Sequence, residues 1–212
     1  FTTRSGPMAS NSITAQAFVP LPGEDPYKAE VKLQIQQVST PGNRGKARVA
    51  LDDHPGATLA SFQIRPYSRG SCHISSRDPQ ADPRMISNHF SDARDIEACL
   101  RALKMSRQLA ATPALSKYLL EEIRPSGSAT SDESLVAYLR ATGATAYHPL
   151  GTCRIGADAF SSVVDAQLRV HGVQGLRVAD GSVCPSIAAT NTNAICIVIG
   201  ERVAQNCLEA QV

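Results

Sequence analysis

Residues 147–156 have the sequence YHPLGTCRIG, and this stretch decides the fold more than any other part of the chain. It places His148 ahead of a proline and of glycines at positions 151 and 156. Glycine and proline mark turns, so the histidine is expected in a loop. An imidazole with an ordinary pKa of about 6.5 can take up or release a proton near neutral pH. Most isolated histidines are structural, so the rest of the chain has to support a catalytic role.

Two further stretches lie downstream of this histidine. Residues 178–182 read VADGS, and residues 189–194 read ATNTNA. Taken alone, Asp180 and Gly181 form a common turn dipeptide, and an asparagine before an apolar helix is usually a cap. An asparagine amide can also donate to, and accept from, an alcohol oxygen without changing its charge. Each stretch therefore predicts only a turn by itself, and a functional meaning depends on combining both with residues 147–156.

The three stretches together resemble the C-terminal third of the glucose-methanol-choline (GMC) family of FAD-dependent oxidoreductases. The family's His-x-x-Gly-Thr-Cys-x-x-Gly pattern is matched over residues 148–156, and its Arg-Pro-x-Ser-Arg-Gly pattern over residues 65–70. The resemblance implies that His148 is the active-site histidine and faces the flavin. It also implies that Asn191 is the partner of His148, because the family carries His or Asn ten residues before the glutamate that stands here as Glu201.

The same resemblance implies which residues would contact FAD. Asp180 and Gly181 are expected at the start of a helix that faces the FAD phosphates, where backbone N–H groups suit an anionic pyrophosphate. Tyr147, Thr192 and Asn193 are expected near the isoalloxazine ring. No metal ion is expected, because the six cysteines include no Cys-x-x-Cys pair and no grouping with histidines at zinc spacing.

The implied reaction is the oxidation of a primary or secondary alcohol, a small-molecule substrate, to a carbonyl compound. His148 would act as the base, Asn191 would orient the substrate, and FAD would accept the hydride. One alternative is a lyase on the same scaffold, similar to hydroxynitrile lyase, which keeps FAD without net oxidation. Another is a non-catalytic partner fragment. The electron acceptor, oxygen for an oxidase or a quinone or dye for a dehydrogenase, is not encoded in these residues.

Composition limits the remaining possibilities. The chain has 212 residues, of which 42% are hydrophobic and 19% charged, as is typical of a folded globular protein. A net charge of +2 with scattered basic residues does not indicate a nucleic-acid partner. No apolar run approaches the about 20 residues that cross a bilayer, so no membrane span is expected. The chain opens on Phe1 without a leader-like stretch, so any targeting segment is expected upstream or already removed, and no compartment is indicated.

Hydrophobic periodicity predicts a sheet in the first part of the chain. After an extended loop, strands with alternating apolar and polar residues are expected. The loop covers residues 1–25, and the strands cover residues 29–38, 46–51, 58–66 and 71–75. A further, buried strand is predicted over residues 176–178.

Helices are predicted after this sheet from their capping signals. Asp92 should cap the first helix, and Thr112-Pro113 should open a short second helix that reaches about residue 123. A capping box over residues 130–133 should open the third. A terminal helix is predicted over residues 194–208, which are apolar at first.

The fold class expected is mixed, α+β/α/β. Residues 1–142 should form most of a substrate-binding domain, an antiparallel sheet with helices. Residues 143–212 should supply the C-terminal strand and helices of a Rossmann-like FAD-binding domain and carry the catalytic residues. The Gly-rich strand-turn-helix that binds the dinucleotide in such domains has no counterpart in this sequence. The expected partner is therefore an N-terminal FAD-binding segment, either a separate chain or a missing part of this one.

Overall fold

A computed structural model describes residues 13–40 and 51–209 of the chain. Two compact units are present. Unit 1 runs to Ser68 and resumes over Phe90–Ala144, and unit 2 comprises Arg69–His89 and the chain from Thr145 onward. The predicted domain limits at residues 142 and 143 stay a prediction.

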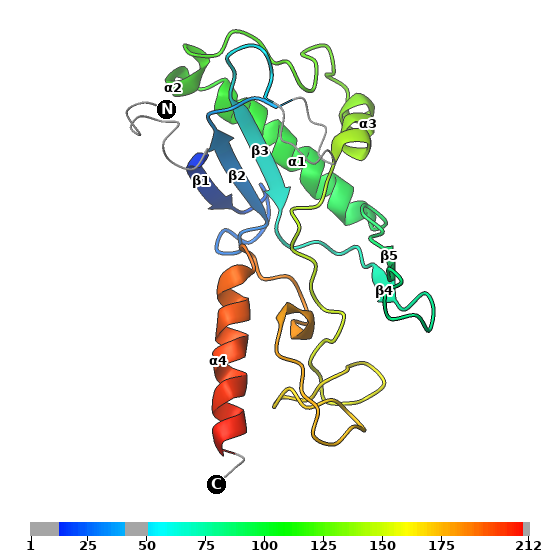
Figure 1. The fold of residues 1–212 in the computed structure, drawn as a ribbon. Helices are drawn as coiled ribbons and strands as arrows, with labels where there is room; N and C mark the ends of the chain where they lie inside the picture. Colours follow the sequence, from blue (N-terminus) through cyan, green and yellow to red (C-terminus); the bar gives the residue numbers. More distant parts are fainter. Residues whose placement is uncertain (1–12, 41–50, 210–212) are drawn as a thin grey trace, which may run out of the picture. The chain divides into compact units, whose positions relative to one another are not determined.

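Unit 1 is built on a three-stranded antiparallel sheet (Figure 1). Its strands, in spatial order, are β1 (Ile13–Val19), β2 (Val31–Gln36) and β3 (Thr58–Gln63). The register places Val31 opposite Val19 on one side and opposite Gln63 on the other. Val31 is completely buried. The strands predicted over residues 29–38 and 58–66 are confirmed as β2 and β3.

β1 contradicts the extended loop predicted over residues 1–25. Its side chains are almost all exposed, because it is an edge strand that pairs with β2 alone. Such a strand is held by backbone hydrogen bonds rather than by apolar burial, so hydrophobic periodicity predicts it poorly. The strand predicted over residues 46–51 lies almost wholly outside the described residues.

The long helix α1 (Ala93–Ala110) packs on β2 and β3. As predicted, Asp92 caps it by accepting a hydrogen bond from the backbone N–H of Arg94 at 3.0 Å. The guanidinium of Arg94 also bonds this carboxylate and lowers the pKa of Asp92 to about 2. The buried core between helix and sheet contains Leu21, Val31, Ala98 and Ala102. The antiparallel sheet with helices expected for this part of the chain is confirmed.

The two shorter helices of unit 1 differ in detail from the prediction. α2 (Pro113–Ser116) ends well before residue 123. Thr112 does not cap it with its side chain but donates its hydroxyl proton back to a carbonyl in the last turn of α1. α3 (Asp132–Thr142) is capped by Ser131, so the predicted capping box began one residue too early.

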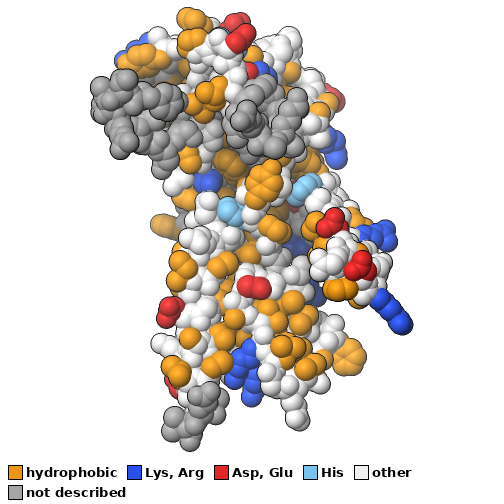
Figure 2. All heavy atoms as spheres, viewed as in Figure 1, with side chains coloured by type: hydrophobic (Ala, Val, Ile, Leu, Met, Phe, Trp, Pro, Cys, Tyr) orange, Lys and Arg blue, Asp and Glu red, His pale blue; other side chains and the backbone are white. Residues whose placement is uncertain are grey.

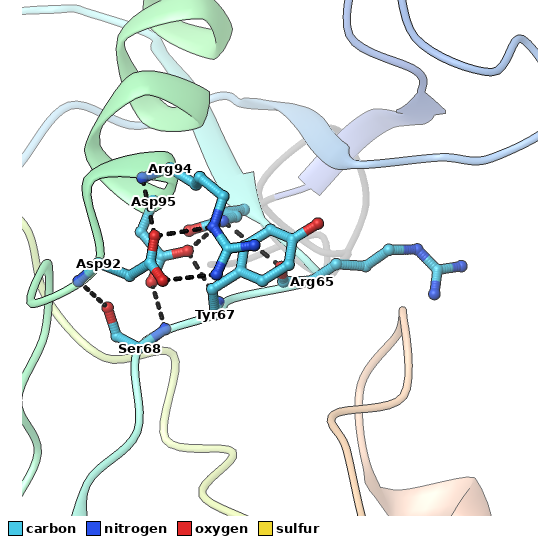
Figure 3. Close-up of polar contacts among 7 residues, drawn as sticks. Arg65, Tyr67, Ser68, Asp92, Arg94 and Asp95 are labelled. Atoms are coloured by element: carbon cyan, nitrogen blue, oxygen red, sulfur yellow. Dashed lines mark hydrogen bonds and ion pairs between the residues drawn. The ribbon is translucent and has the colours of Figure 1, made fainter.

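A buried carboxylate joins α1 to the loop that follows β3 (Figure 3). Asp95 is only 2% exposed and accepts hydrogen bonds from Gln63 Nε2 at 2.8 Å and from the backbone N–H groups of Tyr67 at 2.8 Å and Ser68 at 2.7 Å. The Arg94 guanidinium lies over the Tyr67 ring, 3.7 Å from its centroid. Burial alone would raise the pKa of Asp95, but the hydrogen bonds outweigh it and hold that pKa below its ordinary value.

Unit 2 has less regular secondary structure. It contains the hairpin of β4 (Ser71–His73) and β5 (Arg84–Ile86), the 3-10 helix η2 (Gly181–Val183) and the long helix α4 (Asn193–Glu209). β4 confirms the strand predicted over residues 71–75, and α4 confirms the predicted terminal helix. The buried core of this unit consists of Val164, Leu168 and Val183.

The strand predicted over residues 176–178 is not formed. This segment makes one isolated bridge, between Arg169 and Arg177, and Leu176 stays 50% exposed. A strand gains stability from neighbours along its length. Within residues 13–40 and 51–209, none of the strands in the two sheets pairs with residues 176–178. In the same part of the chain, no helix combines the length and apolarity needed to cross a membrane.

Candidate active site

The histidine cluster, which we define as His148, Asn191 and Thr192, lies within unit 2. The Asn191 Nδ2 atom is 3.1 Å from His148 Nε2, and the Thr192 Oγ1 atom is 3.1 Å from His148 Nδ1. Two consecutive residues just before α4 thus contact both nitrogens of one imidazole. His148 and Thr192 are half-buried, whereas Asn191 is exposed. The structure therefore brings together His148 and Asn191, which the family pattern pairs and which are 43 positions apart.

The backbone before His148 is held in an unusual conformation. Tyr147 has φ 61°, in the left-handed region that non-glycine residues rarely adopt. Its N–H donates to the Thr145 hydroxyl at 2.9 Å, which fixes the turn. Pro149 then restricts His148 to an extended conformation. Such local strain persists where the surroundings over-determine it.

The two glycines of the motif are required by the packing around them. Gly151 has φ 91°, and an added Cβ would lie 3.1 Å from the Cys184 carbonyl oxygen. Gly156 has no room for a side chain either, because an added Cβ would lie 2.6 Å from the Ser162 Cβ atom. The spacing of the motif is thus explained by one tight turn and one close approach of two chain segments.

The motif is joined to η2 by backbone hydrogen bonds. The N–H of Cys153 donates to the Ser182 carbonyl at 2.9 Å, and the N–H of Ile155 donates to the Val183 carbonyl at 2.8 Å. Ile155 packs against the buried core of unit 2, as do Ile199 and Val203 from α4. The three stretches that carry the family resemblance therefore fold into one unit.

Asp180 and Gly181 have well-defined structural tasks. Asp180 caps η2, since its carboxylate accepts the N–H of Ser182 at 2.8 Å; hydrogen bonds from the side chain and backbone of Ser182 lower the pKa of Asp180. Gly181 is buried, and an added Cβ would meet Leu150 Cδ2 at 2.6 Å and Cys196 Sγ at 3.2 Å. The close approach at Gly181 is therefore made by side chains of this chain itself.

The remaining residues predicted to contact the cofactor surround the cluster in sequence. Tyr147 adjoins His148 and is 69% exposed. Asn193 is the first residue of α4 and is exposed. The sequence predicts Thr192 only as a contact of the flavin and does not predict its hydrogen bond to His148. No sequence signal marks that bond apart from the position of Thr192 beside Asn191.

A second histidine in unit 2 has a structural environment. His171 Nε2 lies 3.1 Å from the Ser162 hydroxyl, which in turn donates to the backbone carbonyl of Asp158. Ser162 is buried next to Gly156. These contacts fasten two loops together. They agree with the absence of any family pattern around His171.

Comparisons with known proteins place the chain in a family. The sequence model of the family described as GMC oxidoreductase, C-terminal region, matches residues 66–200. The chain is 35% identical over 202 residues to a Pseudomonas putida protein named alcohol dehydrogenase [acceptor], and the match covers 95% of this chain and 36% of that protein. It is 43% identical over 141 residues to an oxygen-dependent choline dehydrogenase from Citrobacter koseri, with 66% of this chain and 25% of that protein covered.

A solved structure agrees with these sequence matches. The crystal structure of pyridoxine 4-oxidase from Mesorbium loti superimposes with a TM-score of 0.79 at 25% identity, covering 90% of this chain and 36% of that one. The chain thus spans about a third or less of the length of the relatives that it matches. On the family match and the 35% identity along nearly its whole length, the chain belongs to the GMC oxidoreductase family and corresponds to the C-terminal region of its members.

Proposed function

We propose that this chain is the catalytic C-terminal part of an FAD-dependent oxidoreductase that oxidises a primary or secondary alcohol to a carbonyl compound. The observation that carries the proposal is the histidine cluster, in which the imidazole of the family motif is held by the amide of Asn191 and the hydroxyl of Thr192. Relatives named alcohol dehydrogenase and choline dehydrogenase support an alcohol as the class of substrate.

The residues of this chain would act on the alcohol's hydroxyl group. His148 removes the hydroxyl proton at a ring nitrogen, because imidazole is the side chain whose pKa suits proton transfer near neutral pH. Asn191 orients the alcohol oxygen through its neutral amide, which can donate or accept. FAD, when bound, supplies the acceptor for the hydride that leaves the adjacent carbon. The half-buried position of His148 keeps the base close to bulk water without exposing it fully.

The donor set around the cluster fits a flavin ring. The side chains that contact His148 are a neutral amide and a hydroxyl. The long helix α4 begins directly after them and directs its first backbone N–H groups toward this end. Tyr147, Thr192 and Asn193 are accordingly assigned to the isoalloxazine side. Asp180 and Gly181 would shape the backbone near the FAD phosphates, with the carboxylate serving as a cap.

The rest of the FAD site is assigned to a polypeptide segment beyond residues 1–212. α4 has no fully buried residue among those described, and Ile197, Val198 and Leu208 on it are 59%, 64% and 68% exposed. Figure 2 shows hydrophobic side chains spread over this helix and the loops of unit 2. Exposed apolar area of this kind favours burial by further protein. The proposed partner is an N-terminal FAD-binding segment, in the same chain or a separate one.

The first test of this proposal concerns FAD itself. Residues 1–212 produced alone are expected to show no micromolar FAD binding in calorimetry, because the Gly-rich turn that holds the dinucleotide is absent from them. The same residues joined to a segment aligned with the N-terminal part of the Pseudomonas putida relative should bind it. Micromolar binding by residues 1–212 alone would contradict the assignment of the phosphate site to another segment.

The second test compares two asparagines of the same stretch. The flavin-loaded protein is residues 1–212 joined to the N-terminal segment described above, with FAD bound. In this protein, Asn191→Ala should slow flavin reduction by alcohol about 2- to 13-fold, the equivalent of one neutral hydrogen bond. Asn191→His should keep partial activity, since the family uses either residue at that position. Asn193→Ala is the matched control and should change the rate less, and rapid-mixing absorbance of the flavin measures all three. A larger loss in Asn193→Ala than in Asn191→Ala would move the assignment by two residues.

A further inference from the structure

The contacts of the two ring nitrogens of His148 indicate which of them carries the proton of the neutral imidazole. A neutral imidazole carries one proton, on either Nδ1 or Nε2. The Asn191 atom that faces Nε2 at 3.1 Å is the amide nitrogen Nδ2, which can only donate. Nε2 must then accept, and the proton of the neutral ring lies on Nδ1. The atom that faces Nδ1 at 3.1 Å is the hydroxyl oxygen of Thr192, which can accept that proton.

We infer that Thr192 is a positioning residue, whose hydroxyl accepts the Nδ1–H of His148 and so leaves Nε2 unprotonated, as the nitrogen that acts as the base. The inference rests on the proposed function, in which His148 removes the alcohol's proton. Which ring nitrogen is basic is commonly set by the hydrogen bond that the other nitrogen makes. Thr192 takes that part here, in place of a flavin contact alone.

The backbone position of Thr192 suits this task. Its carbonyl accepts the N–H of Cys196 at 3.1 Å, so the residue is fixed by the first turn of α4. Its branched side chain has few rotamers, and it is half-buried. The hydroxyl is therefore presented to His148 by a helix start rather than by a freely moving loop.

During the reaction, Thr192 would keep its hydrogen bond to His148, whereas Asn191 would release its own. The alcohol hydroxyl needs the Nε2 lone pair, so the exposed Asn191 amide has to release that atom and bind the alcohol oxygen instead. Thr192 keeps its bond throughout, because Nδ1 is a donor both in the neutral ring and in the imidazolium that forms. Accepting from the charged form stabilises it, so loss of the hydroxyl should disfavour the imidazolium that forms during proton removal.

The test uses two variants of the flavin-loaded protein. Thr192→Val keeps the shape of the side chain and removes the hydroxyl, whereas Thr192→Ser keeps the hydroxyl. Nitrogen-15 NMR of histidine-labelled protein should show the His148 proton on Nδ1 in the wild type and in Thr192→Ser, and a shift of population toward Nε2–H in Thr192→Val. Flavin content and circular dichroism establish that both variants are folded.

Flavin reduction adds a kinetic readout, with choline, ethanol and benzyl alcohol as the probes. Thr192→Val should lower the limiting reduction rate about 2- to 13-fold at nearly unchanged half-saturating alcohol concentration. It should also move the pH profile of this rate to lower pH, while Thr192→Ser restores both values. An Nε2–H tautomer in the wild type, or a Thr192→Val variant with wild-type tautomer and rate, would overturn the inference. If His148→Ala also reduces flavin at the wild-type rate, the proposed function itself fails; if His148→Ala is inactive, only the role of Thr192 fails.

Discussion

Replacing His148 with alanine is expected to slow flavin reduction by alcohol about 10²–10⁴-fold, the usual contribution of a positioned general base. Flavin content should remain at the wild-type level. The fold around the motif rests on Gly151, Gly156 and backbone bonds to η2, and the imidazole contributes to none of these. His148→Gln should fail in the same way, because an amide keeps polarity but has no nitrogen that titrates near neutral pH.

The matched control for this experiment is His73→Ala. His73 lies on β4, whose side chains are all exposed, so its removal tests the general effect of losing a histidine. Rapid-mixing measurements of the flavin spectrum with choline, ethanol and benzyl alcohol give the reduction rate of each variant. A His148→Ala protein that is reduced as fast as the wild type would remove His148 from the mechanism. A His73→Ala protein as slow as His148→Ala would show that the assay reports general damage.

The pairing of His148 with Asn191 could be predicted only through the resemblance to the GMC family, which is carried by short stretches of sequence. The turn residues after His148 and the ten-residue interval from Asn191 to Glu201 are both visible in the chain. The contact of Thr192 with Nδ1 could not be predicted in this way. It depends on where α4 begins and on the direction of one hydroxyl relative to a ring 44 positions away.

Strands and helices could be predicted from the sequence where one face of the element is buried and the opposite face is exposed. β2 and α1 each bury one face in the same core, so alternation and helical spacing identify them. The edge strand β1 buries almost nothing, and its backbone pairing leaves no hydrophobic signature. The segment Leu-Arg-Val over residues 176–178 gave the opposite error. Its composition suits a buried strand, but Leu176 is half-exposed and the segment makes only one bridge.

The role of glycine at position 181 illustrates the same limit. A small residue after Asp180 is predictable as a turn, and a close approach of the backbone is a sound inference from it. The identity of the approaching group is not local information. It is set by Leu150 and Cys196, which reach the glycine from the motif loop and from α4. The sequence thus predicts that another group approaches Gly181 closely, but it does not predict which side chains make this approach.

The second large effect is expected at Asp95. This residue is buried, and it is distant in sequence from the histidine cluster. Asp95→Asn should lower the free energy of unfolding at pH 7 by about 1–3 kcal/mol. The carboxylate accepts hydrogen bonds from the Gln63 side chain and from the backbone N–H groups of Tyr67 and Ser68. An asparagine replaces one accepting oxygen by an NH₂ group, so at least one of these donors loses its partner in a buried place. Glu97→Gln, an exposed change of the same charge on α1, should alter stability by no more than about 0.5 kcal/mol.

The pH dependence of this effect has a definite sign. The pKa of Asp95 is lowered in the folded protein, so its contribution to stability is fully present above the unfolded-state pKa of about 3.9 and is lost as pH falls through the folded-state value. The difference in stability between wild type and Asp95→Asn should therefore be constant from pH 7 to about pH 5 and shrink below about pH 4. Urea unfolding at a series of pH values, with Glu97→Gln measured in parallel, gives this difference directly. A difference that stays constant down to pH 3 would show that the carboxylate's charge contributes nothing, and that Asp95→Asn destabilises the fold only by replacing an accepting oxygen with an NH₂ group.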